Sequence, residues 1–298
     1  MKNYIKKSSN KIIVGVDKKH KKILSSLKEQ SIKTISVDLR NKDWVEQIRR
    51  KQCDIFVWFP SLHHKWFKLL DRSAFIELFT NKRIFPSLKD SYLFQDKIHQ
   101  KYIFDLHKLP YPKTTIITSS EELQNFIKKT KYPFLIKDVW GFGGDAPKLK
   151  NPGIQIIKNK KEALEFSKSK QWPKYENWTN LEDYIYAQEL LDIKQEFRVI
   201  TIGQKIILSY EKKSDDVLKH VWRGAEILFT KNKKIENFVK QANKKLQLDW
   251  CGWDLVIDKN NKIKILELNT IFGTKVLEQK GLDIEKLITE YIIKQIKK

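Results

Sequence analysis

Short apolar runs and amphipathic stretches alternate along the first third of the chain. The apolar runs are typical of buried strands and lie at 12–16, 35–37 and 55–59. The amphipathic stretches have helical spacing and lie around 18–30, 43–52 and 65–80. Strands that alternate with helices usually join in a parallel sheet, so a small α/β domain is predicted over residues 1–94. No Gly-x-Gly-x-x-Gly turn follows the first strand, which argues against a Rossmann dinucleotide site.

The middle of the chain, residues 95–182, predicts a small α+β unit. A helix over about 91–108 should end before the prolines at 110 and 112, and a capping signal at Ser119-Ser-Glu-Glu122 should open another. Strands are predicted at 114–118, 133–137 and 154–157, with a final helix at 160–170. A glycine-rich loop spans 141–144, and residues 171–180 have the composition of an irregular linker.

The last part, residues 183–298, is richer in strands. Strands are predicted at 184–191, 197–202, 205–210, 252–258 and 262–269, and helices at 235–246 and from 283 onward. Gly203-Gln204 suits a two-residue hairpin turn between the second and third of these strands. The three parts together predict a mixed α/β and α+β protein.

Positive charge dominates the composition, with a formal net charge of +23. Almost all of it comes from lysine, and the lysines are spread along the chain without clustering beside aromatic residues. Proteins that read nucleic acids favour clustered arginine, so no specific nucleic-acid partner is expected. Either a solvated lysine surface or an acidic substrate or partner would account for the excess charge.

Two further features narrow the class of protein. No run approaches the roughly 18 apolar residues of a membrane span, and the apolar run near the start is too short for a signal peptide. Cys53 and Cys251 lack metal-binding spacing and are interpreted as buried thiols. The expectation is a cytoplasmic protein without a membrane partner.

The last two predicted strands carry the strongest candidate for chemistry. A two-residue turn at Asn260-Asn261 would place Asp254 directly opposite Glu267, and Asn269 would share their face of the sheet. Facing carboxylates whose Cβ atoms are about 5 Å apart repel each other, and a divalent cation between them removes that cost. Carboxylate and amide oxygens suit Mg²⁺ or Mn²⁺, which predicts a metal site here.

A solvent-facing polar hairpin is the alternative for the same residues, because acids in water need no cation. Against it, regular alternation would put Ile263 and Ile265 on the same face as Glu267. Carboxylates at the end of a buried strand need a partner. Geometry alone leaves both interpretations open.

A lysine beside a glycine-rich loop is a second candidate. Lys137 ends a predicted strand just before Trp140-Gly-Phe-Gly-Gly144. Backbone N–H groups of such a loop can approach phosphate oxygens closely while the ammonium supplies charge. Most glycine loops only turn the chain, so this signal is weak when it stands alone.

The order and spacing of these pieces resemble the ATP-grasp superfamily, and within it the RimK-like glutamate ligases, from about residue 95 to the end. The segments that carry the resemblance are Asp96-Lys97, Pro133–Lys137 with the glycine loop, Gln188–Leu191, Glu196–Gly203, Trp222–Gly224, Gly252–Asp254 and Glu267–Asn269. The resemblance implies an ATP-grasp fold with an N-terminal parallel-sheet domain, a small lid and a larger C-terminal subdomain.

The resemblance also implies roles for individual residues. The cofactors would be ATP and Mg²⁺ or Mn²⁺, and the metal ligands would be Asp254, Glu267 and Asn269. The residues implied to bind the nucleotide are Lys97, Lys137, Gly141, Gly143, Gly144, Gln188, Glu189, Leu190, Leu191, Glu196 and Lys212. The residues implied to act on the transferring group or substrate are Arg198, Arg223 and Lys213.

The chain departs from the family pattern at several of these positions. Glu196-Phe-Arg198 stands where relatives often have Asp-x-Arg, and Lys212-Lys213 stands where arginines are common. Lysine lacks the bidentate fork of arginine, so the geometry around the substrate is expected to differ. ATP use is unaffected by these changes, whereas the acceptor is left open.

The resulting hypothesis is an ATP-dependent carboxylate–amine ligase that works through an acyl phosphate and takes a small-molecule carboxylate and amine. A ligase that modifies an acidic peptide or protein, by glutamylation or crosslinking, is the narrower alternative. A third possibility is a binding protein that keeps the fold, with a basic surface and no chemistry. The identity of the substrates and the formation of a homo-oligomer are left open.

Overall fold

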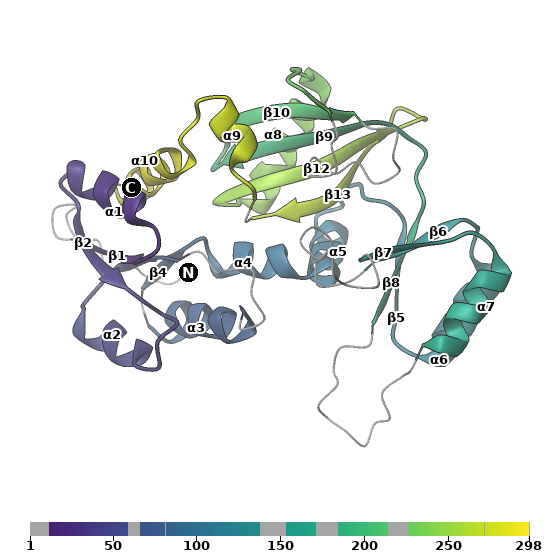
Figure 1. Cartoon of the computed structure of the whole chain (residues 1–298), viewed down its shortest axis with the longest axis horizontal. Helices are drawn as coiled ribbons and strands as arrows, with labels where there is room; N and C mark the ends of the chain where they lie inside the picture. Colours follow the sequence, from purple (N-terminus) through teal and green to yellow (C-terminus); the bar gives the residue numbers. More distant parts are fainter. Residues whose placement is uncertain are drawn as a thin grey trace.

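The computed structural model describes residues 12–58, 66–80, 82–137, 153–170, 184–213, 226–270 and 272–297. These residues form three sheets that follow one another along the chain (Figure 1). Sheet one is parallel, and the other two are antiparallel, as expected for the mixed fold class. None of the described helices combines the length and apolarity that crossing a bilayer requires.

The first sheet is the predicted parallel sheet. Its strands are β1 (Ile13–Asp17), β2 (Lys33–Val37), β3 (Ile55–Val57) and β4 (Arg83–Phe85), in the order β2-β1-β3-β4. Helices α1 (Lys21–Glu29), α2 (Trp44–Arg50) and α3 (Trp66–Phe79) connect them. Strand β4 was not predicted, because its apolar run is only Ile84-Phe85, whereas β3 lies within the longer apolar run 55–59.

Helix α10 (Ile284–Ile296) belongs to the last part of the sequence yet packs on this first sheet. Its Ile288 and Ile292 join Val14 and Val16 in one buried cluster, and α10 lies beside α1 (Figure 1). The opposite face of the sheet is covered by α2 and α3. The predicted division at residues 94 and 182 stays a prediction, and the first unit shares its core with the C-terminal helix.

The predicted helix over 91–108 is two helices. Helix α4 (Leu88–Gln95) ends where Asp96 adopts an extended backbone, and α5 (Lys97–Leu106) begins at the next residue. The Asp96 side chain accepts a hydrogen bond from the backbone N–H of Ile98 and so caps α5. This break places Lys97 in the first turn of α5.

The second sheet forms the lid. It contains β5 (Thr114–Ile117), β6 (Phe134–Lys137), β7 (Ile154–Ile157) and β8 (Ile185–Glu189) in the order β5-β8-β6-β7. Helices α6 (Ser120–Lys129) and α7 (Lys160–Ser169) cover one face. Ser119 caps α6 by accepting a hydrogen bond from the N–H of Glu122, and the Glu122 carboxylate accepts one from the N–H of Thr118, as the capping signal predicted.

The third sheet is the largest and runs β11-β10-β9-β12-β13. Its strands are β9 (Ile193–Ile202), β10 (Lys205–Lys213), β11 (Glu226–Leu228), β12 (Trp250–Asp258) and β13 (Ile263–Asn269). Helix α8 (Lys233–Leu246) covers one face, and the short helix α9 (Lys275–Gln279) precedes α10. The hairpin at Gly203-Gln204 forms as predicted, with a positive φ at Gly203.

The hairpin between β12 and β13 differs from the prediction in two places. Its loop has three residues, 259–261, since Asp258 pairs with Lys262 and Asn261 adopts a positive φ. A β-bulge then adds Leu266 to β13, so that Asp254 still pairs with Glu267. The two one-residue differences cancel at the candidate metal site.

The bulge also corrects the predicted face of β13. Glu267 pairs with Asp254, whereas Ile265 pairs with Leu255, the next residue of β12. Neighbouring residues of a strand point to opposite faces, so Ile265 enters the core while Glu267 faces the other side. The expectation that Ile263 and Ile265 share the face of Glu267 is therefore wrong.

Candidate active site

A row of polar side chains crosses the large sheet on the face opposite α8. Tyr210 on β10 pairs with Arg198 on β9, Arg198 pairs with Asp254 on β12, and Asp254 pairs with Glu267 on β13. Directly opposed residues share a face, so four strands contribute to a single line of functional groups. On the same face, Lys212 pairs with Glu196, two residues away along β10 and β9 from the pair of Tyr210 and Arg198.

Asp254 is the centre of this arrangement. Its Oδ1 atom lies 2.7 Å from the Lys212 ammonium, and its Oδ2 atom accepts hydrogen bonds from the Arg198 guanidinium and, at 3.0 Å, from the amide of Asn269. Lys212 also contacts Glu196 at 3.0 Å. Asp254 and Lys212 are both buried, and buried charges of this kind persist because they are paired.

The pairing keeps both cations of the row protonated. Burial opposes the charge on Lys212, but the carboxylates of Asp254 and Glu196 outweigh it and raise the pKa of Lys212. The pKa of Arg198 is raised in the same way, with burial opposed above all by Asp254. The site therefore presents fixed positive charge next to its acids.

Two more lysines reach the site from other elements. Lys97, in the first turn of α5, places its ammonium 3.3 Å from Oε1 of Glu267. Lys137, the last residue of β6, approaches from the lid: burial and the nearby charge of Lys97 lower its pKa to about 8. The carboxylates of Glu267 and Asp254 act in the opposite direction, which shows that Lys137 lies within their electrostatic reach.

The predicted nucleotide segment 188–191 leads from the lid to the large sheet. Gln188 is buried at the end of β8 and donates a hydrogen bond of 2.9 Å to the hydroxyl of Thr114. Glu189 is instead paired with Lys264 and with the backbone N–H of Lys113. Leu190 and Leu191 follow as the connection to β9, in the place of a hinge.

Some predicted site residues do not join the cluster. Lys213 is exposed and follows Lys212 in β10, where alternation directs it to the opposite face. Gly141, Gly143, Gly144 and Arg223 lie outside the described residues. The glycine loop and Arg223 therefore stay predictions.

Gly252 is a contributor that sequence reasoning missed. It lies two residues before Asp254, and a Cβ there would sit 2.5 Å from Nη2 of Arg198 and 2.7 Å from its Cζ and Nε. The guanidinium thus lies directly over the backbone of β12 and needs the space that glycine leaves. A glycine inside a buried strand often marks such a close approach, and that was the available signal.

Replacing Gly252 with alanine is expected to displace the Arg198 guanidinium and lower kcat by about tenfold, because small misplacements of catalytic groups are costly. The measurement is steady-state turnover of ATP. Gly273→Ala is the matched control, since its Cβ would meet nothing within 4 Å. Equal kcat values for Gly252→Ala and the wild type would contradict this role for glycine.

The described residues supply part of the set of ligands that a magnesium ion needs. No group of three or more His, Cys, Asp or Glu side chains in the described ranges is arranged to hold a metal. Two carboxylates and one amide meet at Asp254, Glu267 and Asn269. Mg²⁺ is commonly held by one or two carboxylates, water and substrate phosphates, so this donor set matches that mode.

Charge in the cluster also favours an anionic ligand. Four cations, Lys97, Lys137, Arg198 and Lys212, face three carboxylates, Glu196, Asp254 and Glu267. The groups come from α5 and from strands of both the lid and the large sheet. An anion placed between the two sheets would meet donors from both sides.

Comparison with known structures identifies the fold as that of the ATP-grasp enzymes. A RimK-domain ATP-grasp protein from Sphaerobacter thermophilus aligns with a TM-score of 0.63 and 10% identity, over 93% of this chain and 98% of that one. The ATP-grasp ligase PsnB, in complex with a minimal precursor, Mg and ADP, gives a TM-score of 0.61 and 16% identity over 98% and 99% of the two chains.

Comparison of the amino-acid sequence places the chain in one family of ATP-grasp enzymes. Residues 94–292 match the model of the RimK-like ATP-grasp domain, so the chain belongs to this family. A coenzyme γ-F420-2:α-L-glutamate ligase from Methanococcus maripaludis is 23% identical over 210 residues, which are 70% of this chain and 69% of that protein. The resemblance seen in the motifs is confirmed, and the protein is an ATP-grasp ligase of the RimK-like family.

Proposed function

We propose that this protein is an ATP- and Mg²⁺-dependent carboxylate–amine ligase that works through an acyl phosphate. The observation that carries the proposal is the convergence of Lys97, Lys137, Arg198 and Lys212 on the facing carboxylates Asp254 and Glu267. Asp254, Glu267 and Asn269 would hold Mg²⁺, which neutralises phosphate charge when bound.

The proposed reaction has two steps. A carboxylate oxygen of the substrate attacks the γ-phosphorus of ATP and ADP leaves, which forms the acyl phosphate. An amine then attacks the acyl carbon, loses a proton and expels inorganic phosphate, leaving an amide. Lys97 and Lys137 would hold the phosphates, and Arg198 would stabilise the charge that develops on the transferring group.

The substrate of the ligase is proposed to be a small molecule or, in the narrower alternative, a peptide. PsnB, a structural neighbour of this chain, has been solved with its precursor peptide. The net charge of +23 favours acidic polypeptides among the candidates. Lys212, in place of the more usual arginine, leaves a point charge in this part of the site.

Release of ADP in the presence of Mg²⁺ and hydroxylamine, a surrogate amine, tests the proposed reaction. Candidate carboxylates would include free glutamate and glutamate-rich peptides, and a hydroxamate product would report activation of the carboxylate. We expect ADP release that depends on the carboxylate. Absence of turnover with every carboxylate, together with no ATP binding by calorimetry, would overturn the proposal.

The lowered pKa of Lys137 predicts how ATP binding depends on pH. The ammonium loses its proton as the pH rises through about 8, so the attraction for phosphate present below that pH is lost above it. We expect ATP affinity, measured by calorimetry without divalent cations, to fall about tenfold between about pH 7 and about pH 9.5. Arginine at position 137 stays charged over this range, so the ATP affinity of Lys137→Arg should change little with pH. An equal decline with pH in the wild type and in Lys137→Arg would show that Lys137 is not the group that titrates.

A further inference from the structure

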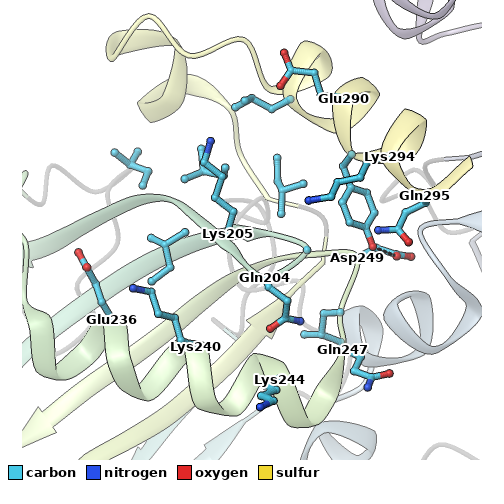
Figure 2. Close-up of a pocket in the computed structure, with 18 of the residues that line it drawn as sticks. Gln204, Lys205, Glu236, Lys240, Lys244, Gln247, Asp249, Glu290, Lys294 and Gln295 are labelled. Atoms are coloured by element: carbon cyan, nitrogen blue, oxygen red, sulfur yellow. Dashed lines mark hydrogen bonds between the residues drawn. The ribbon is translucent and has the colours of Figure 1, made fainter. Parts of the chain in front are cut away.

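A large groove surrounds the tip of the β9–β10 hairpin, away from the row of catalytic candidates. Its volume is about 1490 Å³. Helix α8 lines one side of the groove, α10 lines the other, and the tip of the hairpin lies in the middle (Figure 2). The floor is apolar and includes Ile202, Ile206, Leu248 and Leu287. Small-molecule pockets usually measure roughly 300–1,000 Å³, so this groove suits a larger ligand.

The rim of the groove is strongly basic. Its cationic side chains are Arg83, Lys205, Lys231, Lys240, Lys244 and Lys294. Only three acids line the same space, and one of them, Asp249, is buried and bonded to the hydroxyl of Tyr291 and the backbone N–H of Ser87. Within the described part of the chain, none of the five lysines takes part in an ion pair.

One edge of strand β10 opens into this groove. Strand β11 pairs only with Glu211–Lys213, so the outer edge of residues 205–210 has no strand partner among the residues that the structure describes. Residues 205–209 all line the groove, and the hydroxyl of Ser209 is buried there without a hydrogen-bond partner. Free N–H and C=O groups along a strand edge can pair with another extended chain.

We propose that this groove binds an extended acidic peptide, which adds as a strand along β10. Backbone hydrogen bonds to residues 205–209 would supply affinity, and alternate side chains would meet the apolar floor and the lysines of the rim. Charge complementarity selects an acidic partner. Among its described lining residues the groove offers six cations but a single aromatic side chain, Tyr291, whose hydroxyl is bonded to Asp249. A row of stacking aromatics would be expected for single-stranded nucleic acid, so a peptide is favoured.

The groove is connected to the candidate active site by the same strand. From Lys205 to Lys212 is about 24 Å along β10 at the usual rise per residue. A docked peptide would therefore be held some distance from the reacting atoms, with its continuation free to reach them. This inference rests on the proposed function only in taking the docked chain to be a substrate of the ligase.

A fluorescein-labelled peptide of about ten alternating Glu and Val residues tests the docking, by fluorescence anisotropy at low salt without ATP. The variant Lys205→Glu/Lys240→Glu/Lys294→Glu should bind at least about tenfold more weakly than the wild type. The control Lys22→Glu/Lys128→Glu/Lys168→Glu changes three exposed lysines elsewhere and alters net charge equally, so its binding should stay near that of the wild type.

Two companion probes separate the mechanism from general attraction. A peptide N-methylated at alternate positions cannot donate along one edge and should bind much more weakly, whereas equal binding would overturn strand addition. Equal losses in both triple variants, or equally tight and groove-dependent binding of single-stranded DNA, would overturn the acidic-peptide assignment. ADP release with a small carboxylate and hydroxylamine should be the same in both triple variants, so failure of docking is distinguishable from failure of the ligase reaction.

Discussion

Replacing Glu267 with glutamine is expected to lower Mg²⁺-dependent turnover of ATP by about a thousandfold, because Mg²⁺ would lose a carboxylate ligand and the reaction would lose several kcal/mol of the charge stabilisation that the ion supplies. The substitution keeps the size of the side chain. Glu267 has one close partner in the described residues, the ammonium of Lys97 at 3.3 Å. The folded structure should therefore survive, and the loss should appear in kcat and in a raised requirement for Mg²⁺.

The control for this variant is Glu165→Gln, on an exposed position of α7 in the lid. Turnover by the control should match the wild type, and circular dichroism and melting temperature should match for all three proteins. Retention of turnover within about threefold by Glu267→Gln would rule out the proposed metal site, since a direct ligand contributes far more than that.

Replacing Asp254 with asparagine is expected to destabilise the protein by about 3 kcal/mol and lower its melting temperature by about 6 to 10 °C. Asp254 is buried and accepts from both Lys212 and Arg198. Its neutralisation leaves the largely buried cations Lys212 and Arg198 without the carboxylate that contacts both of them, although Glu196 still contacts Lys212. Removal of one partner from a buried network is costly for this reason.

Asp192→Asn is the matched control for stability. Asp192 forms an ion pair with Lys259 at 2.6 Å, but both side chains are about two-thirds exposed, at 66% and 67%. Exposed pairs contribute about 1 kcal/mol or less, so this variant should melt within a few degrees of the wild type. Similar melting temperatures for Asp254→Asn and Asp192→Asn would show that the Asp254 network does not stabilise the fold.

Most of the architecture could be predicted because it depends on local patterns. Apolar runs located most of the strands, and the capping signal at Ser119 located the start of α6. The details of the β12–β13 hairpin could not be predicted, since neither Asn261 nor Leu266 carries a signal that separates a three-residue loop with a bulge from a two-residue turn. The predicted pairing of Asp254 with Glu267 is nevertheless correct, because the extra residue in the loop and the extra residue in the bulge compensate for each other.

The candidate site could be predicted only in part, because its cations owe their positions to tertiary contacts. Lys97 reaches Glu267 because the helix is interrupted at Asp96 and a new helix begins at Lys97. Helical periodicity alone predicts one continuous helix here. Alternation along β10 separates Lys212 from Lys213, and strand registers decide which of the two faces Asp254. The role of Gly252 emerges only when the guanidinium of Arg198 is placed over it.

Helix α10 has a consequence for the order in which the protein acquires its structure during synthesis. The first sheet leaves the ribosome early, but one of its faces is covered by Ile288 and Ile292 near the other end of the sequence. Until those residues emerge, Val14 and Val16 lack part of their native surroundings. Units that are made early often fold first on the ribosome, whereas this one completes its core only after Ile284–Ile296 has been made, and until then its apolar face is open to shielding by a chaperone.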